Sequence, residues 1–314
     1  MATDTRLTIS LHAPNEENLS EPQQRFLEGL VDRIKRRGLR VLPDSPTTDD
    51  LEKRFEKLRH CHGVVVLAYS QWKAARLYRA QKRTIVMPSE FSHVAAVMAA
   101  AAKRPLLVLR EKTLAERGAL RGGYLPHVVK APASLRTEWL ETSEFEREFN
   151  KWINEVECFR HVFLGYSSKA TEVANSVHKF LSKTMKLRVF DWHDFRTGDT
   201  IWESIERAER LTNCGLFLFM SDDKLSVGNK REFAPRDNVV YEAGYFAGAK
   251  GRKDSLIIRE EGAKVPTDLG GILDLKLVSR GDISPIETPL RLHLERILNT
   301  KLDTVKNSRL ATDY

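Results

Sequence analysis

The segment from Pro235 to Gly248 limits the fold more than any other part of this 314-residue chain. It opens with proline and charged residues, which favour a turn, and continues as small and aromatic residues that we expect to be helical. Apolar stretches at 214–220 and 255–258 flank it. A helix between two apolar strands is typical of a βαβ unit in a parallel sheet. The segment therefore predicts an α/β fold.

The same segment predicts where a ligand would bind. Ligands of such sheets bind beyond the carboxyl ends of the strands, and the start of this helix belongs to that edge. We expect Glu242 in the first turn of the helix, where the helix dipole favours a carboxylate. We also expect it to line one cleft together with Arg236, Asp237 and Asn238.

Two halves of the chain repeat one order of elements. Expected strands lie at 7–11, 39–42, 64–68 and 105–109 in the first half and at 161–165, 187–190, 214–220 and 255–258 in the second. Basic loops are expected at 73–83 and 224–236, each before a helix that we expect to open on a glutamate, Glu90 or Glu242. Cys61 and Glu90 are 90 − 61 = 29 positions apart, and Cys214 and Glu242 are 242 − 214 = 28. We predict two doubly wound parallel-sheet α/β domains in tandem, at 1–157 and 158–314.

Composition limits the partners and the compartment. The formal net charge of +8 favours anionic partners, and no aromatic-interleaved basic strand or zinc-finger spacing is present, so a nucleotide is favoured over nucleic acid. We expect no metal, because the three cysteines have no metal-ligand spacing. No apolar run is long enough for a membrane span and no signal peptide is evident, which favours a cytoplasmic protein.

Three motifs in the second half resemble the bacterial TIR-like predicted nucleotide-binding family, which includes TIR effector domains of CBASS and Pycsar-type antiphage systems. They are 162–168 (VFLGYSS), 234–246 (APRDNVVYEAGYF) and 265–272 (VPTDLGGI). The resemblance implies that the predicted doubly wound domains are flavodoxin-like (TIR-like). It also implies that the second one cleaves NAD, as substrate and not cofactor, at the nicotinamide–ribose bond. It implies Glu242 as the catalytic carboxylate, Arg236 near the phosphates or ribose, and activation by assembly into a homo-oligomer or filament.

The chemistry implied by the resemblance suggests further substrate-binding candidates. Cleavage of this bond passes through an oxocarbenium-like transition state, which a nearby carboxylate stabilises. Tyr166 and Trp192 are candidates to stack on the nicotinamide or adenine ring, and Ser167 and Ser168 to donate to phosphate or ribose. From the residues alone, the favoured interpretation of Glu242 is a carboxylate that only complements the helix dipole.

The first half resembles TIR-like and nucleoside deoxyribosyltransferase-like folds, and we interpret it as a sensor or assembly domain. Its Glu90 follows Val86-Met87-Pro88-Ser89, which has no equivalent of Arg236-Asp237-Asn238. We therefore expect Glu90 to take no part in catalysis, and we leave open whether it binds a ligand.

Three functions remain at this stage. They are an NAD glycohydrolase effector of antiphage defence, a TIR cyclase that makes an ADP-ribose-derived messenger, and a non-enzymatic nucleotide-binding or scaffold module. The sequence does not name the activating signal, for which a cyclic nucleotide and a protein trigger both fit.

Overall fold

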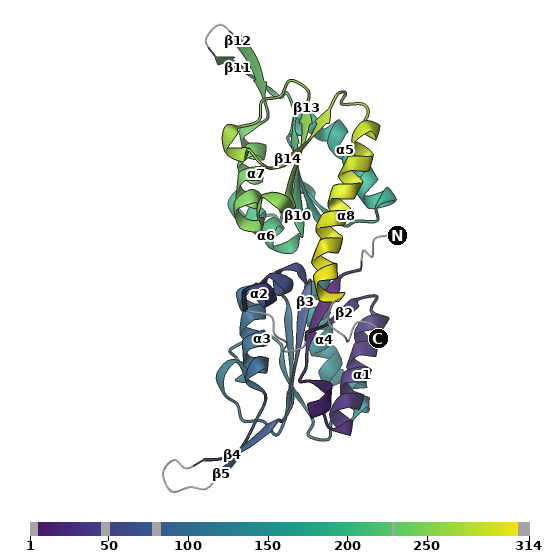
Figure 1. Ribbon diagram of the computed structural model, residues 1–314, viewed down its shortest axis with the longest axis vertical. Coiled ribbons are helices and arrows are strands. Elements are labelled where there is room, and N and C mark those ends of the chain that lie inside the picture. The colour runs from purple at the N-terminus through teal and green to yellow at the C-terminus, as the bar shows by residue number, and fades with distance from the viewer. Residues whose placement is uncertain (1–5, 45–50, 77–82, 228–229, 307–314) are drawn as a thin grey trace. The chain divides into compact units, whose positions relative to one another are not determined.

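The computed structural model describes residues 6–44, 51–76, 83–227 and 230–306. Two compact units form, built mainly from Arg6–Cys158 and Phe159–Leu302 (Figure 1). The elements of the first unit are β1 (Thr8–His12), α1 (Glu21–Arg36), β2 (Arg40–Asp44), α2 (Leu51–His60), β3 (Gly63–Ala68), β4 (Trp72–Arg76), β5 (Arg83–Met87), α3 (Glu90–Ala101), β6 (Leu106–Glu111), β7 (Val128–Ala131) and α4 (Ser143–Glu157). Those of the second are β8 (Val162–Gly165), α5 (Thr171–Lys179), β9 (Val189–Phe190), α6 (Ile201–Leu211), β10 (Cys214–Phe219), β11 (Asp223–Val227), β12 (Lys230–Ala234), α7 (Asp237–Lys250), β13 (Ser255–Glu260), β14 (Leu273–Leu277) and α8 (Ser284–Lys306).

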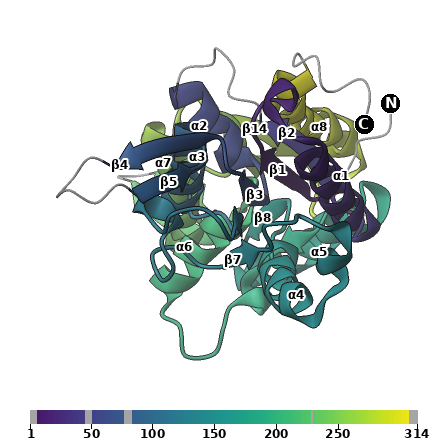
Figure 2. The same ribbon diagram turned by 90° about the horizontal axis from the view of Figure 1, so that it is seen from below.

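Each unit contains a five-stranded parallel sheet. The strand orders are β2-β1-β3-β6-β7 and β9-β8-β10-β13-β14, which is the flavodoxin-like order in both units. The central strands β3 and β10 are buried along their whole length because helices cover both faces of each sheet. In the first unit, α2 and α3 cover one face and α1 and α4 the other (Figures 1 and 2). The predicted pair of flavodoxin-like α/β domains is confirmed.

In the second unit, each sheet face packs into its own core. Val162, Leu216 and Leu256 pack with α5 and α8 on one face. On the other face, Phe163 and Phe217 pack with α6 and α7. Because successive strand residues point to opposite faces, Gly165 lies on the same face as Phe163, toward α7.

The prediction of basic loops at 73–83 and 224–236 is wrong. The structure has antiparallel hairpins there, β4–β5 and β11–β12, each of which projects from its own unit (Figure 1). In the sequence, Gly228-Asn229 is a pair that favours short hairpin connections, and this signal was available. Arg79 and Lys82, which we expected in the first basic loop, lie outside the described residues.

The predicted position of Glu242 in the first turn of its helix is also wrong. Helix α7 begins at Asp237, so Glu242 is its sixth residue. Since α3 begins at Glu90, Glu90 corresponds to Asp237, and Ala95 corresponds to Glu242. Glu242 lies five positions further into its helix than Glu90 does. The two spacings are nearly equal all the same, because hairpin β4–β5 (72–87) is four residues longer than β11–β12 (223–234).

Candidate active site at the carboxyl edge of the second sheet

Glu242 reaches from α7 to the end of the interior strand β8. A Cβ atom built on Gly165, the last residue of β8, would lie 2.6 Å from Glu242 Oε2. Side chains of a helix lean toward its N-terminus, so a residue in the second turn of α7 can reach the carboxyl edge of the sheet. Only a glycine at position 165 leaves room for the carboxylate there.

The surroundings of the Glu242 carboxylate disfavour its charged form. The side chain is partly buried, and in the described part of the chain nothing donates a hydrogen bond to Oε2. Burial raises the pKa of Glu242 from 4.5 to about 7. A strongly perturbed carboxylate at the ligand edge of an α/β sheet is a recognised mark of a functional site.

This raised pKa predicts a pH-dependent stability cost. The unfolded glutamate ionises near pH 4.5, whereas the folded one ionises only near pH 7, so stability is lost as the pH rises between these values. We expect Glu242→Gln to be more stable than the wild-type protein at pH 8, by about 1–3 kcal/mol, with the difference shrinking toward pH 5. Urea unfolding at both pH values measures it. A glutamine variant that is less stable at pH 8 would contradict the assigned pKa.

A polar network joins the loops that follow β8 and β10. Ser167 is buried, and its hydroxyl donates to Oδ2 of Asp222. Lys169 Nζ donates to the Asp222 carbonyl at 2.8 Å and to Asp223 Oδ1 at 3.3 Å. Arg236, the N-cap residue of α7, contacts both carboxylate oxygens of Asp223 at 3.4 Å. Burial by itself would raise the pKa of Asp223, but Lys169 and Arg236 hold it below its usual value.

A second acidic residue closes this edge of the sheet. Glu260, the last residue of β13, accepts from the Ser221 amide at 2.7 Å and from the Arg280 guanidinium at 2.8 and 2.7 Å. These bonds lower the pKa of Glu260. Arg280 also lies 3.6 Å from Oδ1 of the buried Asp222. The sequence motifs did not indicate Asp222, Asp223, Glu260 or Arg280, because their pairing depends on loop geometry.

The predicted aromatic candidates lie away from Glu242. Tyr166 packs against the core on the α5 and α8 face of the sheet, whereas Glu242 comes from the α7 face. Its hydroxyl accepts a hydrogen bond from Trp192 Nε1 at 2.7 Å. Trp192 is 53% exposed and stacks on His193, with ring centroids 3.7 Å apart. A stacking role for Tyr166 or Trp192 stays a prediction.

The remaining candidates lie at helix starts. Asp237 and Asn238 are exposed in the first turn of α7, where Asp237 Oδ1 accepts from the Asn238 amide. The carbonyl of Ser168 accepts from the Thr171 hydroxyl at the start of α5. The structure therefore links Ser167 and Arg236 through Asp222, Lys169 and Asp223, and Glu242 reaches the same edge of the sheet at Gly165.

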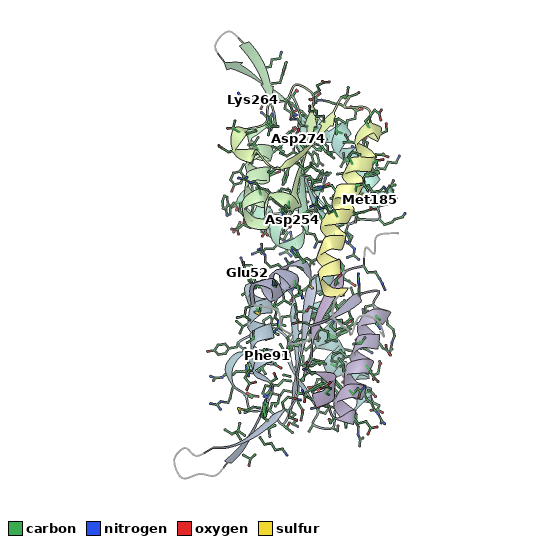
Figure 3. The ribbon with its side chains drawn as sticks, in the orientation of Figure 1. Glu52, Phe91, Met185, Asp254, Lys264 and Asp274 are labelled. Carbon is green, nitrogen blue, oxygen red and sulfur yellow. The ribbon has the colours of Figure 1, made fainter. Side chains whose placement is uncertain are left out.

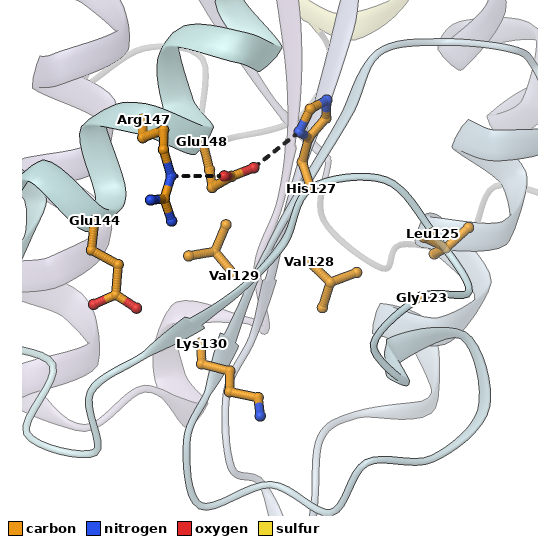
Figure 4. A pocket seen from close by; sticks show the side chains of 9 residues that line it. All are labelled: Gly123, Leu125, His127, Val128, Val129, Lys130, Glu144, Arg147 and Glu148. Atoms are coloured by element: carbon orange, nitrogen blue, oxygen red, sulfur yellow. Dashed lines mark hydrogen bonds and ion pairs between the residues drawn. The ribbon is translucent and has the colours of Figure 1, made fainter.

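A pocket of about 430 Å³ lies in the first unit, and none of these residues lines it (Figure 4). Its lining comes from strand β7, helix α4 and the loop before β7. His127 contacts Glu148 at 3.6 Å and Glu155 at 2.9 Å, and Arg147 contacts Glu148 at 3.3 Å. Three of its charged residues, His127, Arg147 and Glu148, are thus paired with each other, and no predicted site residue lines the pocket.

Comparison with known proteins identifies the second unit. Residues 161–278 match the family model described as "CAP12/Pycsar effector protein, TIR domain". The second unit contains a CAP12/Pycsar-type TIR domain. The resemblance drawn from the sequence motifs is confirmed for this half, and Glu242 lies within the matched range.

The matches to individual relatives of this TIR domain cover different shares of the chain. A CD-NTase-associated protein 12 of Lachnospiraceae bacterium (strain RUG226) is 34% identical over 35% of each chain. Another, from Sphingobacterium faecium, is 28% identical over 49% of each chain. The Pycsar effector protein BcPycTIR of Burkholderia cepacia is 27% identical over 63% of this chain and 65% of its own length. The matched segments of this chain thus span between about a third and two thirds of the length of these three relatives.

The match to the Burkholderia protein reaches beyond the TIR domain. Residues 159–314 are about half of the chain, so a match over 63% of it includes part of the first unit.

Within the described residues, no helix is both long and apolar enough to cross a bilayer.

Proposed function

We propose that the TIR domain hydrolyses NAD to nicotinamide and ADP-ribose, and that this chain is an effector of antiphage defence. The observation that carries the proposal is the carboxylate of Glu242, which meets the end of β8 and whose inner oxygen has no hydrogen-bond donor among the described residues. Oε2 is buried against the strand end, but the side chain as a whole is partly exposed, so in this proposal the carboxylate meets the substrate at the ligand edge of the sheet. The names of the relatives, CD-NTase-associated protein 12 and Pycsar effector protein, support the effector role.

The site supplies what this reaction needs. The C1′–N bond breaks, its electron pair leaves with neutral nicotinamide, and water adds to C1′ and releases a proton. Positive charge develops on the ribose, and the Glu242 carboxylate stabilises it. Because this carboxylate is partly buried, water screens the attraction only weakly. Arg236, at the N-terminus of α7, is placed to face the pyrophosphate.

The raised pKa of Glu242 predicts how activity depends on pH. Only the ionised carboxylate stabilises the oxocarbenium ion, so kcat/KM should rise with pH and reach half of its maximum near pH 7. Initial rates of nicotinamide release between about pH 5.5 and 8.5 measure this profile. A profile that is flat across this range would show that Glu242 ionisation is not required.

Activation by assembly is part of the proposal. An exposed aromatic cluster on α6 and α7 supports it: Trp202 is 52% exposed and Tyr241 42%, with ring centroids 5.6 Å apart. Exposed aromatic groups of this kind are enriched in protein interfaces. In this proposal the trigger is a cyclic nucleotide or a protein signal, and the names of the relatives favour the nucleotide.

The test is direct. The purified chain is incubated with NAD and candidate triggers, nicotinamide and ADP-ribose are quantified, and particle size is followed in parallel. Nicotinamide with linear ADP-ribose supports the hydrolase. A cyclised product would instead establish the cyclase, and no nicotinamide from an assembled protein would establish a non-enzymatic module.

A further inference from the structure

Two exposed cations share one carboxylate at the ligand edge of the second unit. Lys169 Nζ lies 3.3 Å from Oδ1 of Asp223, and Arg236 Nη1 lies 3.4 Å from both carboxylate oxygens. The side chain of Lys169 is 51% exposed and that of Arg236 is 47% exposed. These distances exceed the separation of about 2.7–2.9 Å that is usual for strong charge-assisted hydrogen bonds. The three groups therefore form a loose cluster that a ligand can reach from solvent.

The two cations come from the elements that hold the Glu242 contact. Lys169 lies four residues after Gly165, in the turn that follows β8, and Arg236 is the N-cap residue of α7, six residues before Glu242. A helix rises about 9 Å over six residues, and the side chain of Glu242 leans back toward the helix start. Because Asp223 joins the two cations, a phosphate that reaches one of them also reaches the other. A ribose at Glu242 would thus direct its phosphates toward this pair.

The donors of both cations suit phosphate oxygens. The Lys169 ammonium has three donors, and its shorter bond, of 2.8 Å, goes to the neutral carbonyl of Asp222. Both contacts of Arg236 with Asp223 use Nη1, so Asp223 does not engage the two-pronged face with which a guanidinium binds phosphate. One carboxylate offers a single negative charge to two cations, whereas the pyrophosphate of a dinucleotide offers two. A pyrophosphate therefore matches the pair better than Asp223 does.

The backbone around Asp223 is held in place by its neighbours. The carboxylate of Asp222 is 1% exposed and accepts a hydrogen bond from the Ser167 hydroxyl, and Arg280 donates to the Lys169 carbonyl at 3.3 Å. Burial by itself would raise the pKa of Asp223, but Lys169 and Arg236 hold it below its usual value. Asp223 is therefore ionised at neutral pH, and a ligand can displace it by rotation of side chains alone.

We propose that Lys169 and Arg236 bind the pyrophosphate of the dinucleotide substrate and that Asp223 competes with this pyrophosphate for both cations. Asp223 thereby raises the KM for the substrate, while Glu242 acts on the bond that breaks. The inference rests on the proposed function for the identity of the ligand as a dinucleotide.

Asp223→Asn distinguishes competition from a merely structural role. Asparagine keeps the size of the side chain and an acceptor oxygen but removes the charge, so both cations are released to the substrate. We expect the KM for NAD to fall about 3–10-fold with kcat unchanged, because the substrate no longer has to displace two weak ion pairs. Lys169→Gln should instead raise KM about tenfold. If Asp223 served only to position the cations, its replacement would raise KM.

Asp274→Asn is the matched control for the loss of one negative charge. Asp274, on β14, is 37% exposed and contacts Arg259 at 2.8 Å (Figure 3). Its carboxylate is thus about as exposed as that of Asp223, at 36%, and is likewise paired with an arginine. Asp274→Asn should leave KM unchanged. An equal fall of KM in both variants would indicate a general effect of net charge and would overturn the proposal.

Titration calorimetry separates this inference from the proposed function. ADP-ribose, which contains the pyrophosphate but no bond to nicotinamide, is titrated into the full chain carrying Glu242→Gln, with and without Asp223→Asn. We expect binding to be about 3–10-fold tighter with Asp223→Asn, and the gain to be smaller when Lys169→Gln is also present. Tighter binding to a chain that releases no nicotinamide from NAD would support this subsite and refute the hydrolase. Unchanged or weaker binding, or no saturation below about 1 mM in either chain, would overturn the subsite.

Discussion

Glu242→Gln is expected to reduce nicotinamide release by about 10²–10³-fold or more while the protein stays folded. Glutamine keeps the size of the side chain, so the packing against Gly165 persists, but it carries no charge to stabilise the ribosyl cation. The loss should appear in kcat, because the carboxylate interacts more strongly with the transition state than with bound NAD.

The measurement uses the assembled protein at saturating NAD, with particle size checked for each variant. Glu172→Gln is the matched control, since Glu172 is an exposed carboxylate on α5, over the opposite face of the sheet. It should retain wild-type turnover. Turnover of a folded, assembled Glu242→Gln chain at the wild-type rate would remove Glu242 from the reaction and the hydrolase proposal with it.

Gly165→Ala is expected to cost about 10²-fold in activity without removing any functional group. The added Cβ would lie 2.6 Å from Glu242 Oε2 and 2.7 Å from Phe217 Cδ1, so the carboxylate must move away from the strand end. Overpacking of this kind also destabilises the fold, by about 1–3 kcal/mol.

The control for Gly165→Ala is Gly215→Ala. Its added Cβ would meet the rings of Phe217 at 2.6 Å and Phe246 at 2.8 Å, and no carboxylate is among its nearest atoms. Both variants should lose stability in urea unfolding, but only Gly165→Ala should lose turnover per folded molecule. Equal losses of turnover in the two variants would mean that core packing, and not the position of Glu242, limits the reaction.

The sequence predicted the fold because its pattern is local. Short β-branched and aromatic runs alternate with amphipathic segments, and this order admits few topologies other than a doubly wound sheet. The motif around Glu242 likewise indicated the TIR family, since it is contiguous in the chain. The position of Glu242 within its helix could not be read in the same way, because a hairpin replaced the expected loop and moved the helix start to Asp237.

The amino-acid sequence alone determined the two α/β units and the TIR character of the second, because these depend on neighbours along the chain. Only the tertiary structure decided that Glu242 meets Gly165, that Ser167 meets Asp222, and that Ala95 stands in the first unit where the second has Glu242. These relations depend on strand register and on how far a helix extends over its sheet. Both are set by packing between segments distant in sequence, so neither is written in any one segment.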